Sequence, residues 1–560
     1  MTTLKKDDVL TLEITDLNNL GFGAGKCGDG RVIFVRGAVT GDLVRARIIK
    51  LTRTFGVAKP EEILRPSPLR CREEFCPVPR SCGGCTYREI EYSHELSLKE
   101  NYVRCAFAKA GLPDVTIAPI LNTGATGGYR NKGQYPVCRV QDKLRAGFYA
   151  SKTHRVVPAE DCRLQNPAFA PIVKWICREA DALGVAPYCE ETGAGLLRHI
   201  YLRCGEATGE IMVCLVLNGD RFPDGERFAA RLAEVFPAVV SVLLNENRKN
   251  TNVILGERYT TLFGRNYIED ILCGVRFRIT ADSFYQVNRN SAELLYAKAA
   301  ELADLSGGEL VADLYCGTGT IGLTMAEKAG RLVGVEIVPA AVECANINAR
   351  QNGIGNAEFF CADASAGETL LRCTGGDRPD VVILDPPRKG STPALLDTLA
   401  SLRTPRIVYV SCDPDTLARD VAYMTAKGYR HGTLYPVDMF PRCGHVETVV
   451  LLSHKKPDSH INIKVEFGEG EGKVPLKAIA ERAEAYKPKE RVTYKMIKEY
   501  IEAKYGFKVH TAYIAEVKRD LGLPMYDAPN AVEELKNPRK HPTAEKVEAI
   551  KDALKYFEVI

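Results

Sequence analysis

Asp313-Leu-Tyr-Cys-Gly-Thr-Gly-Thr-Ile-Gly322 is the stretch of sequence that decides the fold. It has the pattern of a strand that runs into a glycine-rich turn, and Gly317 begins a match to Gly-x-Gly-x-x-Gly. Glycine permits a tight turn and lets the backbone approach a ligand closely. From Ser291 to about Leu452, helical and strand patterns alternate, which predicts a doubly wound, Rossmann-like α/β sheet. A tight turn without a ligand is the alternative for the glycines alone.

Acidic residues follow the strands of this predicted sheet, at the edge where open α/β sheets bind ligands. Glu336 ends the next strand and can accept both hydroxyls of a ribose, Asp363 could meet an adenine ring, and Asp385 ends the fourth strand. Asp313 precedes the turn, where an acid suits the cationic amine of a methionine better than a pyrophosphate. The pattern favours S-adenosylmethionine, with a nicotinamide-dependent oxidoreductase as the alternative.

Cys412 ends a further strand, in Arg-Ile-Val-Tyr-Val-Ser-Cys-Asp-Pro (406–414). A thiol reacts as the thiolate, and nearby cations or a helix start lower its pKa. Arg388 and Arg419 are candidate cationic neighbours, so we expect a reactive cysteine rather than a buried inert one. Glu447 begins the last strand beside the same edge and is a candidate base, the alternative being a solvated surface glutamate.

The bulk composition describes a globular protein of several domains. A chain of 560 residues predicts roughly three or four domains. The formal net charge of +4 is too small to indicate a polyanionic partner, so any nucleic-acid surface must come from local patches. The sequence has no signal-peptide pattern and no apolar run of the roughly 18–20 residues that span a bilayer, which predicts a cytoplasmic protein without membrane contact.

Pattern changes along the chain predict four domains. Short strands with glycine turns over residues 1–62 predict a small antiparallel, mildly basic barrel, either an RNA-binding module or a generic structural barrel. Residues 63–280 predict a central α+β domain, and residues 281–453 carry the sheet described above. After a polar linker at 453–460, three helical stretches near 492–505, 511–521 and 543–557 predict an accessory domain over residues 461–560. It is either helix-turn-helix-like or a plain helical unit for protein contact or stability.

The nineteen cysteines all lie at or before Cys443, which also indicates a boundary before the last domain. In a reducing compartment, metal binding, catalysis or burial are the expected uses. Cys76, Cys82 and Cys85 place three thiols in one short loop. Their spacing fits zinc as well as a [4Fe–4S] cluster. Cys71 lies close by in the sequence and could be mistaken for a ligand.

These motifs resemble those of the RNA uracil-5-methyltransferases. The resemblance covers about residues 1–453 and rests on the glycine turn, Leu-Asp-Pro-Pro-Arg-Lys-Gly (384–390), Val-Ser-Cys-Asp-Pro (410–414) and His-Val-Glu-Thr-Val (445–449), in the family's order. Ser283-Phe-Tyr-Gln-Val-Asn288 resembles the family's substrate and cofactor motif. The barrel resembles the TRAM domain of the branch that modifies ribosomal RNA.

The resemblance implies methylation of carbon 5 of uridine in RNA, with S-adenosylmethionine as methyl donor. It implies Cys412 as nucleophile toward carbon 6 and Glu447 as the base, with Asp385 and Gln286 near cofactor and uracil, and Tyr315 and Glu336 as cofactor contacts. The target base must leave its stack, at a cost of a few kcal/mol.

The resemblance also adds Cys162 as a fourth cluster ligand and favours [4Fe–4S] over zinc. The implied substrate is 23S ribosomal RNA, with transfer RNA as the alternative, and the chain is expected to be a monomer. A non-catalytic RNA-binding iron–sulfur protein is a further alternative, against which the presence of both Cys412 and Glu447 argues.

Overall fold

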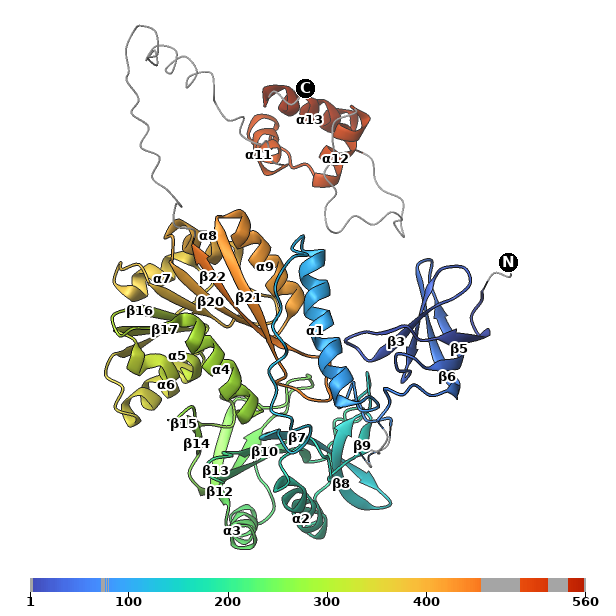
Figure 1. Cartoon of the computed structure of the whole chain (residues 1–560), viewed down its shortest axis with the longest axis vertical. Helices are drawn as coiled ribbons and strands as arrows, with labels where there is room; N and C mark the ends of the chain where they lie inside the picture. The colour runs from blue at the N-terminus through green and yellow to red at the C-terminus, as the bar shows by residue number, and fades with distance from the viewer. Residues whose placement is uncertain are drawn as a thin grey trace. The chain divides into compact units, whose positions relative to one another are not determined.

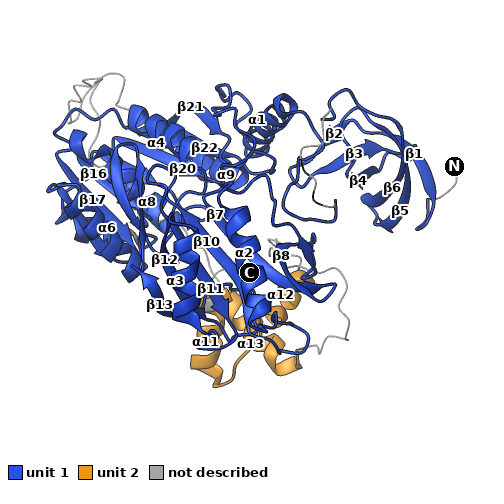
Figure 2. Cartoon of the chain, turned by 90° about the horizontal axis from the view of Figure 1, so that it is seen from below, with its two compact units in different colours: residues 1–458 blue, residues 459–560 orange. Residues whose placement is uncertain are grey.

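The computed structural model describes residues 4–71, 76, 78, 80–454, 494–521 and 542–557. The chain divides into two compact units, residues 1–458 and 459–560 (Figure 2). The first unit contains a barrel, a central α+β region and a doubly wound sheet (Figure 1). Among the described residues, no helix is both long and apolar enough to cross a membrane.

The N-terminal sheet has six strands in the order β1-β5-β6-β4-β3-β2. Its apolar side chains alternate with exposed ones and enclose a core that includes Ile33, Val35 and Val44. All neighbouring strands are antiparallel except β4 and β6, which run parallel, so the expectation of a purely antiparallel barrel is wrong at this pair. The strands are β1 Val9–Glu13, β2 Asp16–Leu17, β3 Phe22–Lys26, β4 Val32–Arg36, β5 Leu43–Leu51 and β6 Phe55–Arg65.

The central region consists of a long helix, a mixed sheet and a hairpin. Strands β10 and β11 are buried along their whole length, because the sheet is covered on both faces there. The sheet order is β13-β12-β11-β10-β7-β8-β9. The elements are α1 Tyr92–Lys109, β7 Lys132–Val140, β8 Lys143–Tyr149, β9 Val156–Pro158, α2 Phe169–Ala182, β10 Leu197–Cys204, β11 Ile211–Leu217, α3 Gly225–Val235, β12 Val239–Glu246, β13 Arg258–Gly264, β14 Ile268–Leu272 and β15 Val275–Ile279.

The third region is a seven-stranded sheet in the order β18-β17-β16-β19-β20-β22-β21. The chain order reverses between β16 and β19, and open α/β sheets bind ligands at such a switch point. Its strands are β16 Leu310–Leu314, β17 Arg331–Glu336, β18 Ala357–Cys361, β19 Val381–Leu384, β20 Arg406–Ser411, β21 Tyr429–Val437 and β22 Glu447–His454. Its helices are α4 Arg289–Ala303, α5 Thr320–Met325, η1 Ala326–Lys328, α6 Pro339–Gln351, α7 Gly367–Thr374, α8 Pro393–Ser401 and α9 Pro414–Ala426.

The last strand, β22, runs in the opposite direction to the other described strands of this sheet. β22 is antiparallel to both β20 and β21, because a loop without a described helix or strand joins β21 to β22 and no crossover intervenes. Glu447, the first residue of β22, therefore lies at the same sheet edge as the carboxyl ends of the parallel strands.

The second unit has its own apolar core, which includes Ile497, Ile501, Ile514 and Ile550. Its described helices are α11 Tyr494–Tyr505, α12 Thr511–Asp520 and α13 Ala544–Tyr556. Most of the polar linker predicted at 453–460, and the chain from 461 to 493, lie outside the described residues.

Candidate active site

The glycine turn connects β16 to α5 through three residues with left-handed backbone. Tyr315, Gly317 and Gly319 have φ angles of 64°, 56° and 80°. The Asp313 Oδ2 atom accepts a hydrogen bond of 2.8 Å from the backbone N–H of Gly322. A Cβ at Gly322 would lie 2.8 Å from that same oxygen, so the close approach of helix to strand requires glycine.

Asp313 lies in β16 just before the turn, and only one of its two oxygens has a hydrogen-bond partner. The side chain is 1% exposed, and its Oδ1 atom has no hydrogen-bond partner. Burial, together with the charges of Asp385 and Glu336, raises the pKa of Asp313 to about 7. An unpaired buried carboxylate oxygen is costly, so this geometry fits a cationic or hydrogen-bond-donating ligand group.

Glu336 and its neighbours form the second part of the turn site. The Glu336 carboxylate accepts hydrogen bonds from the backbone N–H groups of Gly317 (3.1 Å) and Val338 (2.9 Å). Ile337 and Val338 expose apolar side chains directly after the strand. Asp363 lies after β18 and is exposed, and hydrogen bonding from the Ser365 side chain and backbone N–H lowers its pKa. A carboxylate beside exposed apolar groups suits a ribose attached to a flat, apolar-faced base.

Gln286 is buried and connects to this turn through Tyr296, a residue that the sequence motifs did not indicate. Gln286 hydrogen-bonds Tyr296, whose hydroxyl lies 3.0 Å from the Thr320 hydroxyl at the start of α5. The Tyr315 backbone N–H donates to the Val335 carbonyl on β17 (2.9 Å). Both residues therefore lie beside the cofactor turn.

Cys412, Asp385 and Glu447 follow or begin three strands of the same edge. Ser411, the last residue of β20, pairs with Thr448 of the antiparallel strand β22. Cys412, which follows Ser411, and Glu447, which precedes Thr448, are therefore neighbours. Burial and the charge of Asp385 raise the pKa of Glu447 to about 8, and the Arg388 guanidinium partly opposes this. Burial raises the pKa of Asp385 to about 7.

The pKa of the Cys412 thiol is raised, so the expectation that nearby cations lower it is wrong. Burial and the carboxylates of Glu447 and Asp385 raise the pKa of Cys412 to about 12, against the opposing effect of Arg388. Arg419, the other expected neighbour, instead pairs with Asp420 and donates to the Lys389 carbonyl. A thiol surrounded by acids is held in its protonated form, so it becomes a thiolate only when a base accepts its proton.

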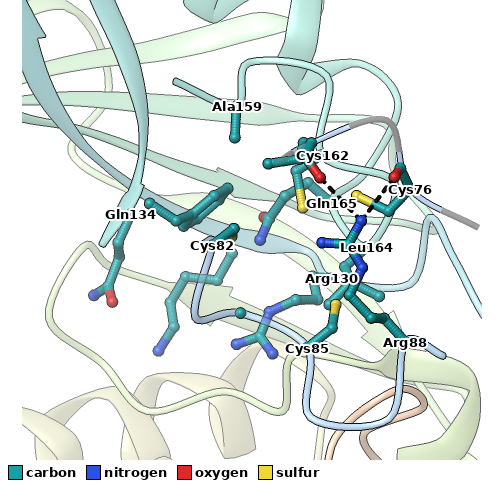
Figure 3. A pocket seen from close by; sticks show the side chains of 14 residues that line it. Cys76, Cys82, Cys85, Arg88, Arg130, Gln134, Ala159, Cys162, Leu164 and Gln165 are labelled. Atoms are coloured by element: carbon teal, nitrogen blue, oxygen red, sulfur yellow. Dashed lines mark hydrogen bonds between the residues drawn. The ribbon is translucent and has the colours of Figure 1, made fainter. Parts of the chain in front are cut away.

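The four predicted cluster cysteines line one cavity of about 240 Å³ (Figure 3). Burial and the nearby Cys443, Cys162, Cys76 and Cys82 thiols raise the pKa of Cys85 far above its usual range. Cys71 is absent from the lining and instead donates to the Ile90 carbonyl. Within the described ranges, no three His, Cys, Asp or Glu side chains are grouped as they would be around a single metal ion.

The same cavity is lined by three cations, Arg88, Arg130 and Lys132. The Arg88 guanidinium donates to the carbonyls of Cys76 (2.8 Å) and Val78 (2.9 Å) and so ties down the cysteine loop. Burial and the charges of Arg203 and Arg130 lower the pKa of Lys132 to about 8. The lining thus combines four cysteine thiols with positive charge, which favours an anionic occupant.

Comparison with known proteins agrees with this architecture. Residues 241–455 match the tRNA (Uracil-5-)-methyltransferase family, and residues 5–60 match the TRAM domain. An uncharacterized RNA methyltransferase of Halalkalibacterium halodurans is 38% identical over 453 residues, which cover 81% of this chain and 98% of the relative. A second one, from Clostridium acetobutylicum, is 39% identical over 452 residues, with 80% and 98% covered.

A solved structure extends the likeness to three dimensions. The Pyrococcus abyssi tRNA (uracil-54, C5)-methyltransferase, in complex with S-adenosyl-L-homocysteine, is 26% identical with a TM-score of 0.64. The match covers 79% of this chain and all of that one. A methyltransferase of this kind, rather than a nicotinamide-dependent oxidoreductase, accounts for the glycine turn. The chain therefore belongs to the RNA uracil-5-methyltransferase family, is an RNA-methylating enzyme, and carries a TRAM domain at its N-terminal end.

Proposed function

We propose that this enzyme methylates carbon 5 of a uridine in RNA through a covalent adduct between Cys412 and carbon 6. The observation that carries the proposal is the meeting of the Cys412 thiol with the Asp385 and Glu447 carboxyls at one sheet edge. Carbon 5 of uracil is a poor nucleophile. Addition of sulfur to carbon 6 moves the ring electrons toward the carbon 4 carbonyl and gives an enolate that is nucleophilic at carbon 5.

The buried acids supply the proton transfers that this route requires. The thiol proton must leave as the sulfur–carbon bond forms. Ionised Asp385 accepts it, so Glu447 is still unprotonated for the later step. After carbon 5 is methylated, Glu447 removes the proton that remains there. The released electrons re-form the carbon 5–carbon 6 double bond and expel the Cys412 sulfur. A carboxyl with a pKa of about 8 is a stronger base than an ordinary glutamate once it is ionised.

S-Adenosylmethionine would supply the electrophilic methyl group. Asp313 offers its unpartnered Oδ1 to the methionine amine, and Glu336 offers its carboxylate to the ribose. Ile337 provides an exposed apolar contact for the base, with Asp363 close to it in the fold after β18. Tyr315 would contact the cofactor, and Gln286 and Asp385 would lie near both the cofactor and the uracil. The bound S-adenosyl-L-homocysteine in the Pyrococcus abyssi enzyme supports the same ligand here.

Two variants test the covalent route in opposite ways. Cys412→Ala should abolish methylation while S-adenosylhomocysteine still binds in calorimetry. Glu447→Gln should form the methylated adduct and then stall, so that denaturing gels retain RNA on the protein. Methylation by the alanine variant, or no adduct with folded Glu447→Gln enzyme, would reject the mechanism.

The proposed substrate is 23S ribosomal RNA, because the TRAM barrel and the cysteine loop together resemble the ribosomal branch of the family. Transfer RNA is the second candidate, since the similar Pyrococcus abyssi enzyme is named for a transfer RNA uridine. Mapping 5-methyluridine in ribosomal and transfer RNA from cells with and without the gene decides between them. Loss of the mark only from transfer RNA would overturn the ribosomal assignment.

We also propose that Cys76, Cys82, Cys85 and Cys162 hold a [4Fe–4S] cluster. Four thiolates around a cubane carry net negative charge, and Arg88, Arg130 and Lys132 on the same wall would compensate it. Anaerobically purified protein should be brown with about four irons per chain. Cys85→Ser should remove the colour, whereas the matched change Cys71→Ser, outside the cavity, should keep it. Zinc in place of iron in anaerobic protein would refute the cluster.

A further inference from the structure

We propose that four buried charged residues position the catalytic base. This charge cluster consists of Glu95 and Lys99 from α1, and Asp438 and Arg442 from the loop at residues 438–446, here called the base loop. The proposal rests on the proposed role of Glu447, which directly follows the base loop. Figure 1 shows α1 lying beside β21 and α9, which brings it next to the start of this loop.

The base loop has no helix or strand of its own among its described residues. It joins β21 to β22, and its end fixes where the first residue of β22 begins. Strand pairing places the backbone of Glu447 opposite Val437 of β21, and Thr448 opposite Ser411 of β20. The base loop closes this end of β21 and β22, so the position of the Glu447 carboxyl relative to Cys412 depends on this pairing and on what holds the base loop. Catalytic groups must be held to within a fraction of an ångström for proton transfer to be efficient.

Lys99 holds the beginning of the loop. Its ammonium group donates to Asp438 Oδ1 (2.6 Å), to the Phe440 carbonyl (3.1 Å) and to Glu95 Oε1 (2.7 Å). The other oxygen of Asp438 accepts a hydrogen bond of 2.8 Å from the Tyr92 hydroxyl. Both side-chain oxygens of Asp438 thus bind α1, which fixes the orientation of the carboxylate as well as its position.

Glu95 holds the middle of the loop. Its Oε1 atom also accepts a 2.7 Å hydrogen bond from the backbone N–H of Arg442. The Arg442 guanidinium lies 3.8 Å from Glu95 Oε2 and donates to the Ile90 carbonyl. Lys99, Glu95 and Asp438 are at most 1% exposed, and Arg442 is 6% exposed. Two positive and two negative charges are buried together, so the cluster is balanced.

The substrate side of the site is fastened to the same loop. The Asn288 side chain donates to the Met439 carbonyl, and the Ser291 hydroxyl donates to the Asp438 carbonyl. Asn288 and Ser291 follow Gln286 at the start of α4. The Tyr129 hydroxyl donates to the Pro441 carbonyl. The base loop therefore connects two parts of the site: Glu447 follows it in the chain, and hydrogen bonds join it to the segment that carries Gln286.

Stability alone does not explain this arrangement. Buried ion pairs are often no more stabilising than apolar side chains of similar volume, because desolvation offsets the attraction. Their directional contacts nevertheless select one conformation of a loop that would otherwise have several. Here the selected conformation is the one in which β22 starts at Glu447. The four residues of the charge cluster, and Tyr92 through its hydrogen bond to Asp438, are therefore positioning residues rather than catalytic ones.

Tyr92→Phe is the test variant, because it removes one hydroxyl donor to Asp438 and leaves every charge in place. The rate of methyl transfer in a single turnover should stay within about twofold of that of the parent. The rate of release of the methylated RNA should fall about tenfold, which is less than the roughly hundredfold loss caused by a misplacement of about 1 Å. The readout is the fraction of enzyme retained as RNA adduct on a denaturing gel during turnover. Asp438→Asn, which keeps the side-chain shape, should accumulate more adduct than Tyr92→Phe.

Tyr423→Phe is the matched control, because Tyr423 also donates a 2.8 Å hydrogen bond to an aspartate, Asp397, but between α8 and α9. It should accumulate no adduct. Equal slowing of both steps in Tyr92→Phe, no change in either step, or the same adduct fraction in the control would overturn the positioning role. Absence of adduct even in Glu447→Gln would instead reject the covalent function itself and the inference with it.

Discussion

Glu447→Gln should change how the stability of the protein depends on pH. Burial and Asp385 raise the pKa of Glu447 from 4.5 to about 8. The folded protein therefore holds a proton there that the unfolded chain has lost, and folding stability falls as pH rises between those two values. Each pH unit in this range is worth about 1.4 kcal/mol. Between about pH 5.5 and about pH 7.5, the unfolding free energy of the parent should therefore fall by about 3 kcal/mol because of Glu447. The glutamine variant should not show this loss.

The measurement is urea unfolding of both proteins across this pH range, without cofactor or RNA. The difference in unfolding free energy should grow steadily with pH in favour of Glu447→Gln. Glu358→Gln is the control, because Glu358 forms an exposed pair with Arg331, worth about 0–1 kcal/mol, and its difference should stay flat. A difference that does not change with pH would show that Glu447 is ionised at neutral pH and that the argument from burial fails.

The same shift links stability to catalysis. If Glu447 acts as base, release of the methylated product should accelerate as pH rises toward about 8, where the carboxyl ionises. Conditions that favour the active base are therefore those in which the folded state is least stable. A site that lowers the stability of the folded state in this way is expected where a buried acid must serve as a base near neutral pH.

The candidate site could be predicted from sequence where a short motif coincides with a strand end. Asp313, Glu336, Asp385 and Cys412 each follow an apolar run, and the rule that parallel strands present their carboxyl ends at one edge brings them together. The helices of the last unit could be located for a similar reason, since their apolar periodicity is local. What these residues do in the site remains a proposal.

Contacts between distant segments could not be predicted. Lys99 and Asp438 are 339 positions apart, and neither lies in a recognisable motif, so only the folded chain reveals their ion pair. The raised pKa of Cys412 was missed for the same reason. The sequence offers Arg388, from another strand-end motif, as a candidate neighbour of the thiol. The burial of Cys412 and the position of Glu447 depend on the pairing of β20 with β22.

Three further predictions address the cofactor turn, the packing behind it and the last unit. Asp313→Asn should weaken S-adenosylhomocysteine binding about 10- to 100-fold in calorimetry, because a charged hydrogen bond to the amine is lost; unchanged affinity would remove Asp313 from the site. Gly334→Ala should destabilise the protein by about 1–3 kcal/mol in thermal unfolding, because its Cβ would lie 2.2 Å from the Phe359 ring, whereas Gly308→Ala, with nothing within 4 Å, should not. A chain ending at His454 should fold, bind cofactor and methylate a short RNA, because β22 is complete there and the last unit has its own core. Its affinity for long RNA should fall less steeply with salt if lysines of the last unit contact phosphates, and loss of cofactor binding on truncation would show instead that this unit completes the methyltransferase core.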